Sequence, residues 1–257
     1  MKKTLSMAAI ALFMMTASCS SDDSNETVNP STETVLLKKI VTTYEDGSTE
    51  TGELSYEGNK LIKMVYGEEE YETFLYNNDG LLAERHIFAI NDNHEYKHVY
   101  TYDTSNKLIS FSEIFTHSIG SYNTRITFTY ISNNTITAMR YISLGDAEEE
   151  LYDTSIITLT NNNIASVSTE TASGSSETTS SFTYDDKNNP LKNISAYEVI
   201  MLTGYRHGGG INNLISESDS IDGVLYTSEY EYNSNGYPTT MTDSEDGEQT
   251  TTQYFYE

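Results

Sequence analysis

Cysteine, proline and tryptophan are almost absent from these 257 residues, which contain one cysteine, three prolines and no tryptophan. A single cysteine excludes an internal disulfide and any metal site built from several thiolates, so a hydrophobic core must hold the folded chain together. Proline removes the backbone donor that a central strand needs, and its scarcity leaves the chain free to form many hydrogen-bonded strands.

Basic residues are also scarce, with 14 Lys and Arg against 39 Asp and Glu and a formal net charge of −25. A field of this sign repels nucleic acid and anionic lipid head groups, so no nucleic-acid partner is expected. The simplest interpretation is a solvated acidic surface, while cations and basic partners stay open.

The first residues have the pattern of an export signal. Lys2 and Lys3 precede a largely apolar stretch, residues 5–15, that is too short to span a bilayer as a helix. Thr16-Ala17-Ser18-Cys19 then places small residues before the only cysteine, which resembles a bacterial lipobox. We predict that residues 1–18 are a lipoprotein signal peptide and that Cys19 carries lipid. The mature chain then has 239 residues, with 12 basic against 39 acidic side chains and a net charge of −27.

Residues 19–34 are predicted to be the lipidated cysteine and a flexible acidic linker, because the segment 20–34 has one apolar residue and cannot bury a core. Its start, Ser20-Ser21-Asp22-Asp23-Ser24, resembles the acidic export signal of Bacteroidota surface lipoproteins. That resemblance implies an outer-membrane protein displayed at the cell surface, with the lipid anchor as its membrane partner. An ordinary acidic tether is the alternative.

A repeated unit fills residues 35–257, which we predict to be a single β domain. In each unit an aromatic–x–Tyr triplet is followed by an Asn/Asp/Gly turn and then an aliphatic residue. Clear triplets are Phe74-Leu75-Tyr76, Tyr100-Thr101-Tyr102, Phe128-Thr129-Tyr130, Phe182-Thr183-Tyr184 and Tyr230-Glu231-Tyr232, with Leu54-Ser55-Tyr56 as a variant and Leu159 as a degenerate copy. A blurred copy is expected at 208–214, inside the long gap between Tyr184 and Tyr232.

The unit predicts two antiparallel strands. Tyr, Phe and Thr suit pleated strands, alternation puts both rings of a triplet on one face, and Asn, Asp and Gly permit tight reversals. No helical period is sustained, so helix is expected to be scarce. The predicted fold is all-β, a long antiparallel meander of strand–turn–strand repeats.

The motif Tyr-x-Tyr-Asp, a turn and then Leu, as in residues 100–108, resembles the YD repeats of RHS-type shells. It is still more similar to a group of Bacteroidota surface lipoproteins of unknown function with a porin-like fold. The resemblance implies a broad sheet curled toward a barrel and supplies no catalytic residues. Charged strand residues, including Lys63, Glu84, Arg85, Glu229 and Glu231, argue against a wall that faces lipid.

One motif points to an enzyme: His94-Glu95-Tyr96-Lys97-His98 has the H-E-x-x-H pattern of zinc peptidases. Those enzymes carry it on a helix, where both histidines reach one zinc and the glutamate is the general base. Here it runs into a predicted strand, in which His94 and His98 would lie about 13 Å apart. We therefore expect no zinc, no cofactor and no catalytic residue.

Weaker signals remain. The Asp and Asn turns have oxygen ligands that suit Ca²⁺, but tight turns need the same residues. Asp219-Ser220-Ile221 resembles an O-glycosylation sequon of exported Bacteroidota proteins, which makes Ser220 a candidate for modification. The predicted function is a non-enzymatic surface lipoprotein that binds or contacts an unidentified partner. A zinc peptidase and a purely structural envelope protein are the alternatives.

Overall fold

A computed structural model describes residues 34–257, except 68–69, 90–93, 118–119, 146 and 246. Residues 34–257 form one compact unit, and the predicted signal peptide and linker, with Cys19, lie outside the described residues. The strands are β1 Leu37–Thr43, β2 Thr49–Glu57, β3 Lys60–Tyr66, β4 Glu70–Tyr76, β5 Leu82–Ala89, β6 His94–Tyr102, β7 Leu108–His117, β8 Gly120–Ser132, β9 Thr135–Leu144, β10 Glu150–Thr160, β11 Asn163–Thr171, β12 Glu177–Tyr184, β13 Leu214–Asp219, β14 Gly223–Tyr232, β15 Pro238–Glu245 and β16 Glu248–Tyr256.

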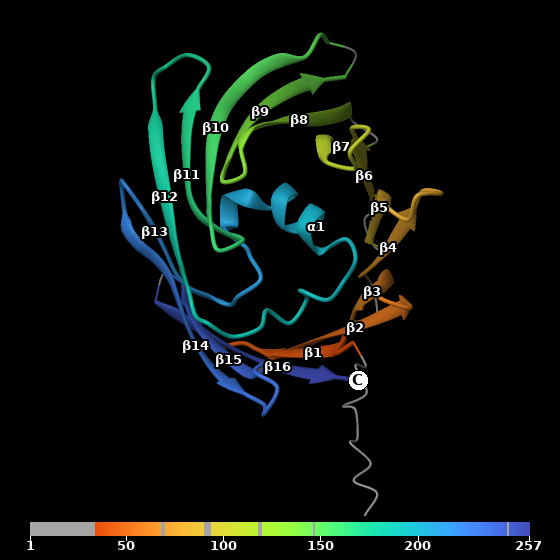
Figure 1. Ribbon diagram of the computed structural model, residues 1–257, viewed down its shortest axis with the longest axis vertical. Coiled ribbons are helices and arrows are strands. Elements are labelled where there is room, and N and C mark those ends of the chain that lie inside the picture. Colours follow the sequence, from red (N-terminus) through yellow and green to blue (C-terminus); the bar gives the residue numbers. More distant parts are fainter. Residues whose placement is uncertain (1–33, 68–69, 90–93, 118–119, 146, 246) are drawn as a thin grey trace, which may run out of the picture. The chain divides into compact units, whose positions relative to one another are not determined.

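These strands form a closed barrel in which each one pairs with its neighbours in the chain (Figure 1). The first and last strands complete the ring, with β1 antiparallel to β16 from Leu37–Tyr256 to Thr43–Thr251. Backbone hydrogen bonds between Leu36 and Glu257 extend this pairing, so both ends of the barrel unit lie at the same rim. The predicted all-β meander is confirmed, and the expected curling reaches full closure.

The tight turns at this rim share one design. The side-chain oxygen of Asn77 accepts the amides of residues 79 and 81, at 3.0 and 2.9 Å. Asp103 and Asn233 do the same in their turns. Gly80 and Asn106 adopt the positive φ values, 79° and 63°, that the reversal requires. The turn oxygens are thus engaged with their own backbone.

The alternation predicted for the triplets is confirmed. Phe74, Tyr100, Phe128 and Phe182 are buried inside the barrel, whereas the residues that follow them are exposed. These rings join the aliphatic residues that follow the turns in one core, which includes Leu61, Leu82, Leu108 and Ile164.

The last tyrosine of a triplet also makes a hydrogen bond to the unit before it. In six even-numbered strands its hydroxyl donates to a backbone carbonyl at or next to the start of the preceding odd-numbered strand. The pairs are Tyr56 with Leu37, Tyr76 with Leu61, Tyr102 with Leu82, Tyr130 with Leu108, Tyr184 with Ile164 and Tyr256 with Pro238, at 2.6–3.1 Å. Each such bond contributes about 0.5–1.5 kcal/mol.

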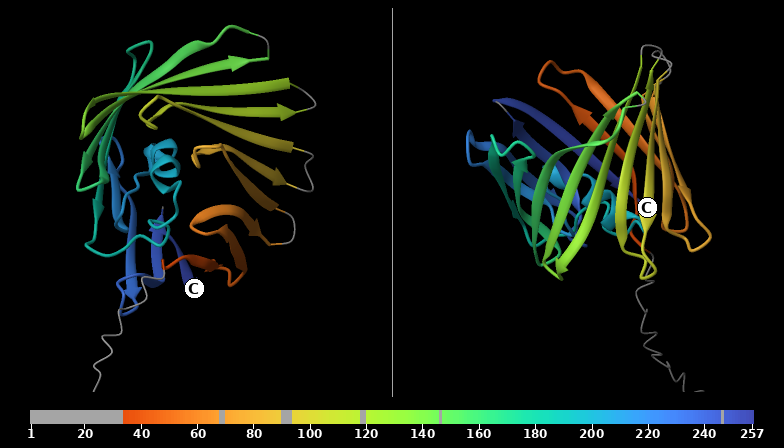
Figure 2. Two further views of the ribbon diagram at one scale, coloured as in Figure 1. Left: turned by 45° about the vertical axis from the view of Figure 1, so that its right-hand side comes forward. Right: turned by 90° about the horizontal axis from the view of Figure 1, so that it is seen from above.

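The connection between β12 and β13, residues 185–213, enters the barrel (Figures 1 and 2). It contains α1, Tyr197–Thr203, and the 3₁₀ turn η1, Tyr205–His207, and we call it the plug. Ile194, Ala196, Leu202 and Tyr205 of the plug are buried in the barrel core. The expected blurred copy at 208–214 is wrong, because residues 208–213 belong to this connection and β13 begins only at Leu214.

Serine and threonine dominate the outer wall. One row of cross-strand neighbours runs Thr129, Thr137, Ile156, Ser168 and Thr179. A second row runs Thr183, Ser216, Thr227, Ser244 and Gln249, so that nine of these ten residues are polar. The barrel therefore has an apolar inside and a largely polar outside. Among the helices of the described residues, none has the length and apolar character that crossing a membrane requires.

Candidate functional site

The H-E-x-x-H motif lies in strand β6, as predicted. His98 points inward and is buried, with Nε2 3.3 Å from a carboxylate oxygen of Glu113 and its ring edge-on to Phe111. The side chains of His94 and Glu95 lie outside the described part of the chain. A strand does not supply the one-turn spacing by which a helix brings two histidines onto one zinc.

Ser220 is exposed at the hairpin turn between β13 and β14. Its hydroxyl oxygen accepts the amide of Thr179 at 3.0 Å, and Asp219 caps the turn by accepting the amides of Ile221 and Asp222. Modification of Ser220 and lipidation of Cys19 stay predictions.

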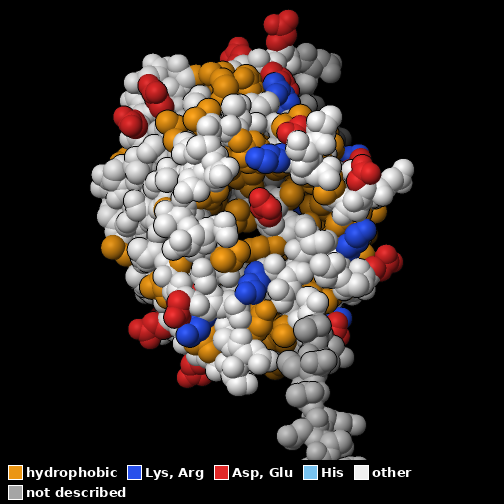
Figure 3. All heavy atoms as spheres, in the orientation of Figure 1, with side chains coloured by type: hydrophobic (Ala, Val, Ile, Leu, Met, Phe, Trp, Pro, Cys, Tyr) orange, Lys and Arg blue, Asp and Glu red, His pale blue; other side chains and the backbone are white. Residues whose placement is uncertain are grey.

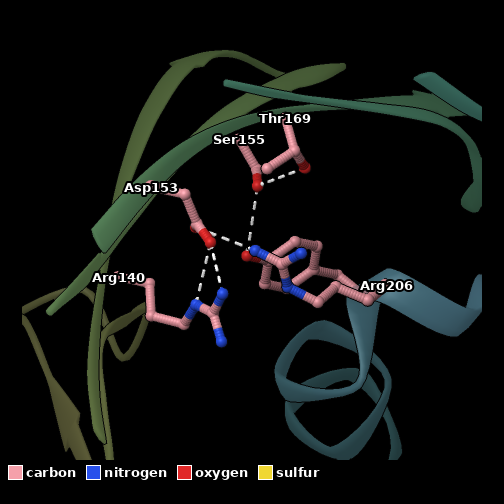
Figure 4. Close-up of polar contacts among 6 residues, drawn as sticks. Arg140, Asp153, Ser155, Thr169 and Arg206 are labelled. Carbon is pink, nitrogen blue, oxygen red and sulfur yellow. Dashed lines mark hydrogen bonds and ion pairs between the residues drawn. The ribbon is translucent and has the colours of Figure 1, made fainter. Parts of the chain in front are cut away.

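The main charged cluster of the described interior is centred on Asp153, which is 2% exposed (Figure 4). Arg140 lies opposite it on β9, and its Nε donates to Asp153 at 3.0 Å. Arg206 of η1 donates to the other carboxylate oxygen at 2.8 Å. One buried carboxylate thus joins the barrel wall to the plug.

Beside this cluster, three hydroxyl groups form a chain of hydrogen bonds that also connects the plug to the barrel wall. Tyr205 of η1, 1% exposed, donates to the Ser155 hydroxyl at 3.3 Å, and Ser155 shares a 2.8 Å bond with Thr169. Ser155 and Thr169 are cross-strand partners on β10 and β11, so the register alone brings them together. Sequence reasoning missed this group because its third member comes from the plug.

A second inward-facing group is centred on Arg85, which donates two 2.7 Å hydrogen bonds to Glu72. Arg85 was expected among the charges that oppose a lipid-facing wall, but its partner across the sheet is the buried Phe74, so Arg85 faces inward. Burial raises the pKa of the neighbouring Tyr100 hydroxyl to about 12. The hydrogen bond with His98 holds the pKa of Glu113 below its ordinary value.

The two groups favour a structural role over catalysis. Glu72 and Asp153 are each bound by arginine, which leaves neither carboxylate free to act as a general base. Three buried side-chain atoms of these groups, Tyr100 Oη, His98 Nδ1 and Arg206 Nε, have no hydrogen-bond partner among the described residues.

A groove lies at the tight-turn rim, between α1 and the turns that precede β7, β9 and β11. It consists of two adjoining cavities of about 430 and 380 Å³ that share Leu159, Asn162, Glu198 and Met201. Figure 3 shows this face hollowed near its centre, with hydrophobic side chains in the hollow and an acidic one beside it. We call it the rim groove, and it has the size of a small-molecule site.

The barrel is similar to two solved structures. A porin-like protein from Bacteroides vulgatus ATCC 8482 superimposes with a TM-score of 0.54 at 11% identity, over 87% of this chain and 99% of that one. A porin-like protein from Bacteroides uniformis ATCC 8492 gives 0.54 at 14% identity, over 86% and 96%. No family model and no curated protein matches the sequence. At these identities the likeness establishes the class of fold, a porin-like β-barrel.

Proposed function

We propose that this chain is a non-enzymatic surface lipoprotein of the outer membrane. Cys19 anchors it through lipid, and its barrel stands in water as a binding or interaction module. The anchor and the location rest on the signal-like first 18 residues and the acidic segment that follows them.

The polar outer wall supports a barrel in water. A barrel that crosses a bilayer presents an apolar band to the lipid, and a lysine or arginine at the midplane costs about 2–4 kcal/mol. Here the two outer rows are almost entirely Ser and Thr, and Glu84 and Lys97 form a 2.8 Å ion pair on the outside. This surface is suited to water, and a lipid chain would then hold the protein at the membrane.

The filled interior argues against a transport pore. The plug buries Leu202 and Tyr205 in the barrel core and is fixed by the Asp153 ion pairs. A conducting porin has instead a polar, water-filled lumen. Binding at the surface of the molecule is therefore the function that this geometry supports best.

Replacing the lipidated cysteine tests the anchor. The Cys19→Ala variant should lose lipid labelling and leave the membrane fraction, because no other feature of the proposal holds the barrel there. Wild-type protein should label with lipid and fractionate with the outer membrane, and protease added to intact cells should cleave it. If Cys19→Ala still sediments with outer membranes, the proposed anchoring is wrong.

A further inference from the structure

Position 159 is where the repeat loses its tyrosine. The corresponding positions near the ends of the other even-numbered strands are Tyr56, Tyr76, Tyr102, Tyr130, Tyr184, Tyr232 and Tyr256. In six of these the hydroxyl binds a carbonyl of the preceding odd-numbered strand. On β10 the equivalent residue is Leu159, and the equivalent carbonyl belongs to Ile136 on β9.

The rim groove occupies the space that this tyrosine would fill. Leu159 and Ile136 both line the 380 Å³ cavity of the groove, and Leu159 also lines the adjoining cavity of 430 Å³. In other units the tyrosine ring covers this region and a lysine lies over the ring, as Lys107 lies 4.8 Å from the centre of Tyr130. The smaller leucine leaves the groove open against α1.

The walls of the groove offer hydrogen-bonding groups that the protein does not use. The side chains of Asn106, Asn133, Asn162 and Glu198 line it, and none of them has a hydrogen-bond or ion-pair partner among the described residues. Asn106 and Asn162 sit at turns with φ of 63° and 61°. Amides donate and accept, and a carboxylate accepts at two oxygens, so the rim can satisfy several neighbouring hydroxyls at once.

The floor of the groove is apolar, formed by Leu108, Ile136, Leu159 and Met201, with the ring of Tyr130 at one side. An apolar floor with planar polar groups around it matches a sugar ring, which has a C–H face and a circumference of hydroxyls. Lys107 and Lys192 also line the groove, but Lys107 lies over the ring of Tyr130 and Lys192 donates a hydrogen bond to Asn188. Glu198 is therefore the charge of the groove that has no partner among the described residues, and its carboxylate disfavours an anionic ligand. The unpaired amides disfavour a wholly apolar ligand, because they would be buried without a partner.

We propose that the rim groove is a saccharide-binding site, created by Leu159 in place of the repeat tyrosine, that takes a neutral sugar of one or two rings. The proposal rests on the proposed binding role and gives it a ligand class. Each of the two cavities lies within the range of about 300–1,000 Å³ typical of ligand sites.

Restoring the repeat residue is the sharpest test. Leu159→Tyr should fill the groove, and its hydroxyl can bind the Ile136 carbonyl as the other tyrosines bind theirs, so the barrel should stay folded. Leu75→Tyr is the matched control, because Leu75 is half exposed on the outer wall and away from the groove. Glu198→Gln removes one charged acceptor on the exposed side of α1.

The probes are D-glucose, D-galactose, D-mannose, N-acetyl-D-glucosamine, maltose and cellobiose. Saturation-transfer NMR would measure their binding to the full mature protein in a detergent without a sugar head group, which makes the result independent of the membrane anchor. Wild type and Leu75→Tyr should bind at least one probe. Leu159→Tyr should bind none, and Glu198→Gln should bind about tenfold or more weakly.

Two results would overturn the proposal: no probe binds wild type, or a probe that binds wild type binds folded Leu159→Tyr equally well. If thermal melting shows that Leu159→Tyr does not fold, the Glu198→Gln variant provides the test. Unchanged affinity of that variant for the sugar that wild type binds then refutes the site. Neither result bears on whether Cys19 anchors the protein.

Discussion

Single side chains link the repeat units to one another. The tyrosine of a triplet packs its ring in the core and donates its hydroxyl to the preceding unit, so Tyr102 joins β6 to the Leu82 carbonyl on β5 at 2.6 Å. The alternation of residues along a strand predicted which rings face inward. It could not predict this partner, because the distance between Tyr102 and Leu82 depends on the register between β5 and β6, in which Glu84 lies opposite Val99.

Substitutions in the triplet that ends at Tyr102 separate the contribution of the tyrosine ring to stability from the contribution of its hydroxyl. Tyr102→Ala should lower the free energy of unfolding by about 3–5 kcal/mol, since it removes a core aromatic ring. Tyr102→Phe should cost about 1 kcal/mol, because only the hydrogen bond is lost. Thr101→Ala, on the exposed face, should cost under about 1 kcal/mol. Urea titrations measure all three, and a loss at Thr101 equal to that of Tyr102→Ala would contradict the assigned register.

The buried Asp153 makes a second prediction for a single residue. Asp153→Asn should destabilise the protein by about 3–5 kcal/mol, because Arg140 and Arg206 would be left close together without their shared anion. Arg125→Gln is the control: it breaks a 2.6 Å ion pair with Glu149, but on the surface, and should cost under about 1 kcal/mol. Equal thermal shifts in the two variants would show that Asp153 does not hold the plug.

At the scale of elements, the repeated pairs of antiparallel strands follow from the sequence and the plug does not. Aromatic alternation and turn residues mark the strands locally. The long gap between the Tyr184 and Tyr232 triplets marked this stretch as irregular, but α1 has only seven residues, too few to show a helical period. Its position inside the barrel depends on contacts with Asn163 and Tyr184, far away in the chain. The rim groove was missed for the same reason, since α1 forms one wall.

A glycine at the docking point of the plug provides a test. A Cβ on Gly210 would lie 2.7 Å from the Asn163 Cα and would clash with the Asn163 side chain, so Gly210→Ala should cost about 1–3 kcal/mol. Gly204 ends α1 at a φ of −93°, and its nearest neighbour atom would be 3.6 Å away, so Gly204→Ala should be tolerated. Hydrogen exchange of α1 amides would show faster opening only in Gly210→Ala. Equal protection in both variants would contradict this docking.

At the scale of the whole molecule, tyrosine hydroxyls determine how the barrel responds to alkali. Burial raises the pKa of Tyr100, Tyr130 and Tyr197 to about 12, and many other tyrosines are raised in the same direction. An unfolded tyrosine ionises near a pKa of about 10. Between pH 10 and pH 12 the tyrosines of the unfolded chain lose protons that the buried tyrosines of the folded barrel retain. The contribution of these hydroxyls to the free energy of unfolding is therefore complete below pH 10 and is lost as the pH rises toward 12.

Alkaline titration should therefore show phenolate absorbance and loss of β circular dichroism rising together above pH 10. Replacing Tyr130 by Phe should weaken this pH dependence, because one raised hydroxyl is removed, while stability at pH 7 changes by only about 1 kcal/mol. If most tyrosines ionise near pH 10 with the barrel still folded, their hydroxyls are not buried as described.

The central claim is that the barrel stands in water and holds no open pore. The most direct measurement takes residues 35–257, without signal, anchor or linker, and follows them through purification without detergent and mixing with liposomes. The account predicts a folded, soluble barrel that stays out of the lipid fraction and leaves the membranes non-conducting. A chain that folds only in detergent or lipid, or that inserts and conducts ions, would contradict it.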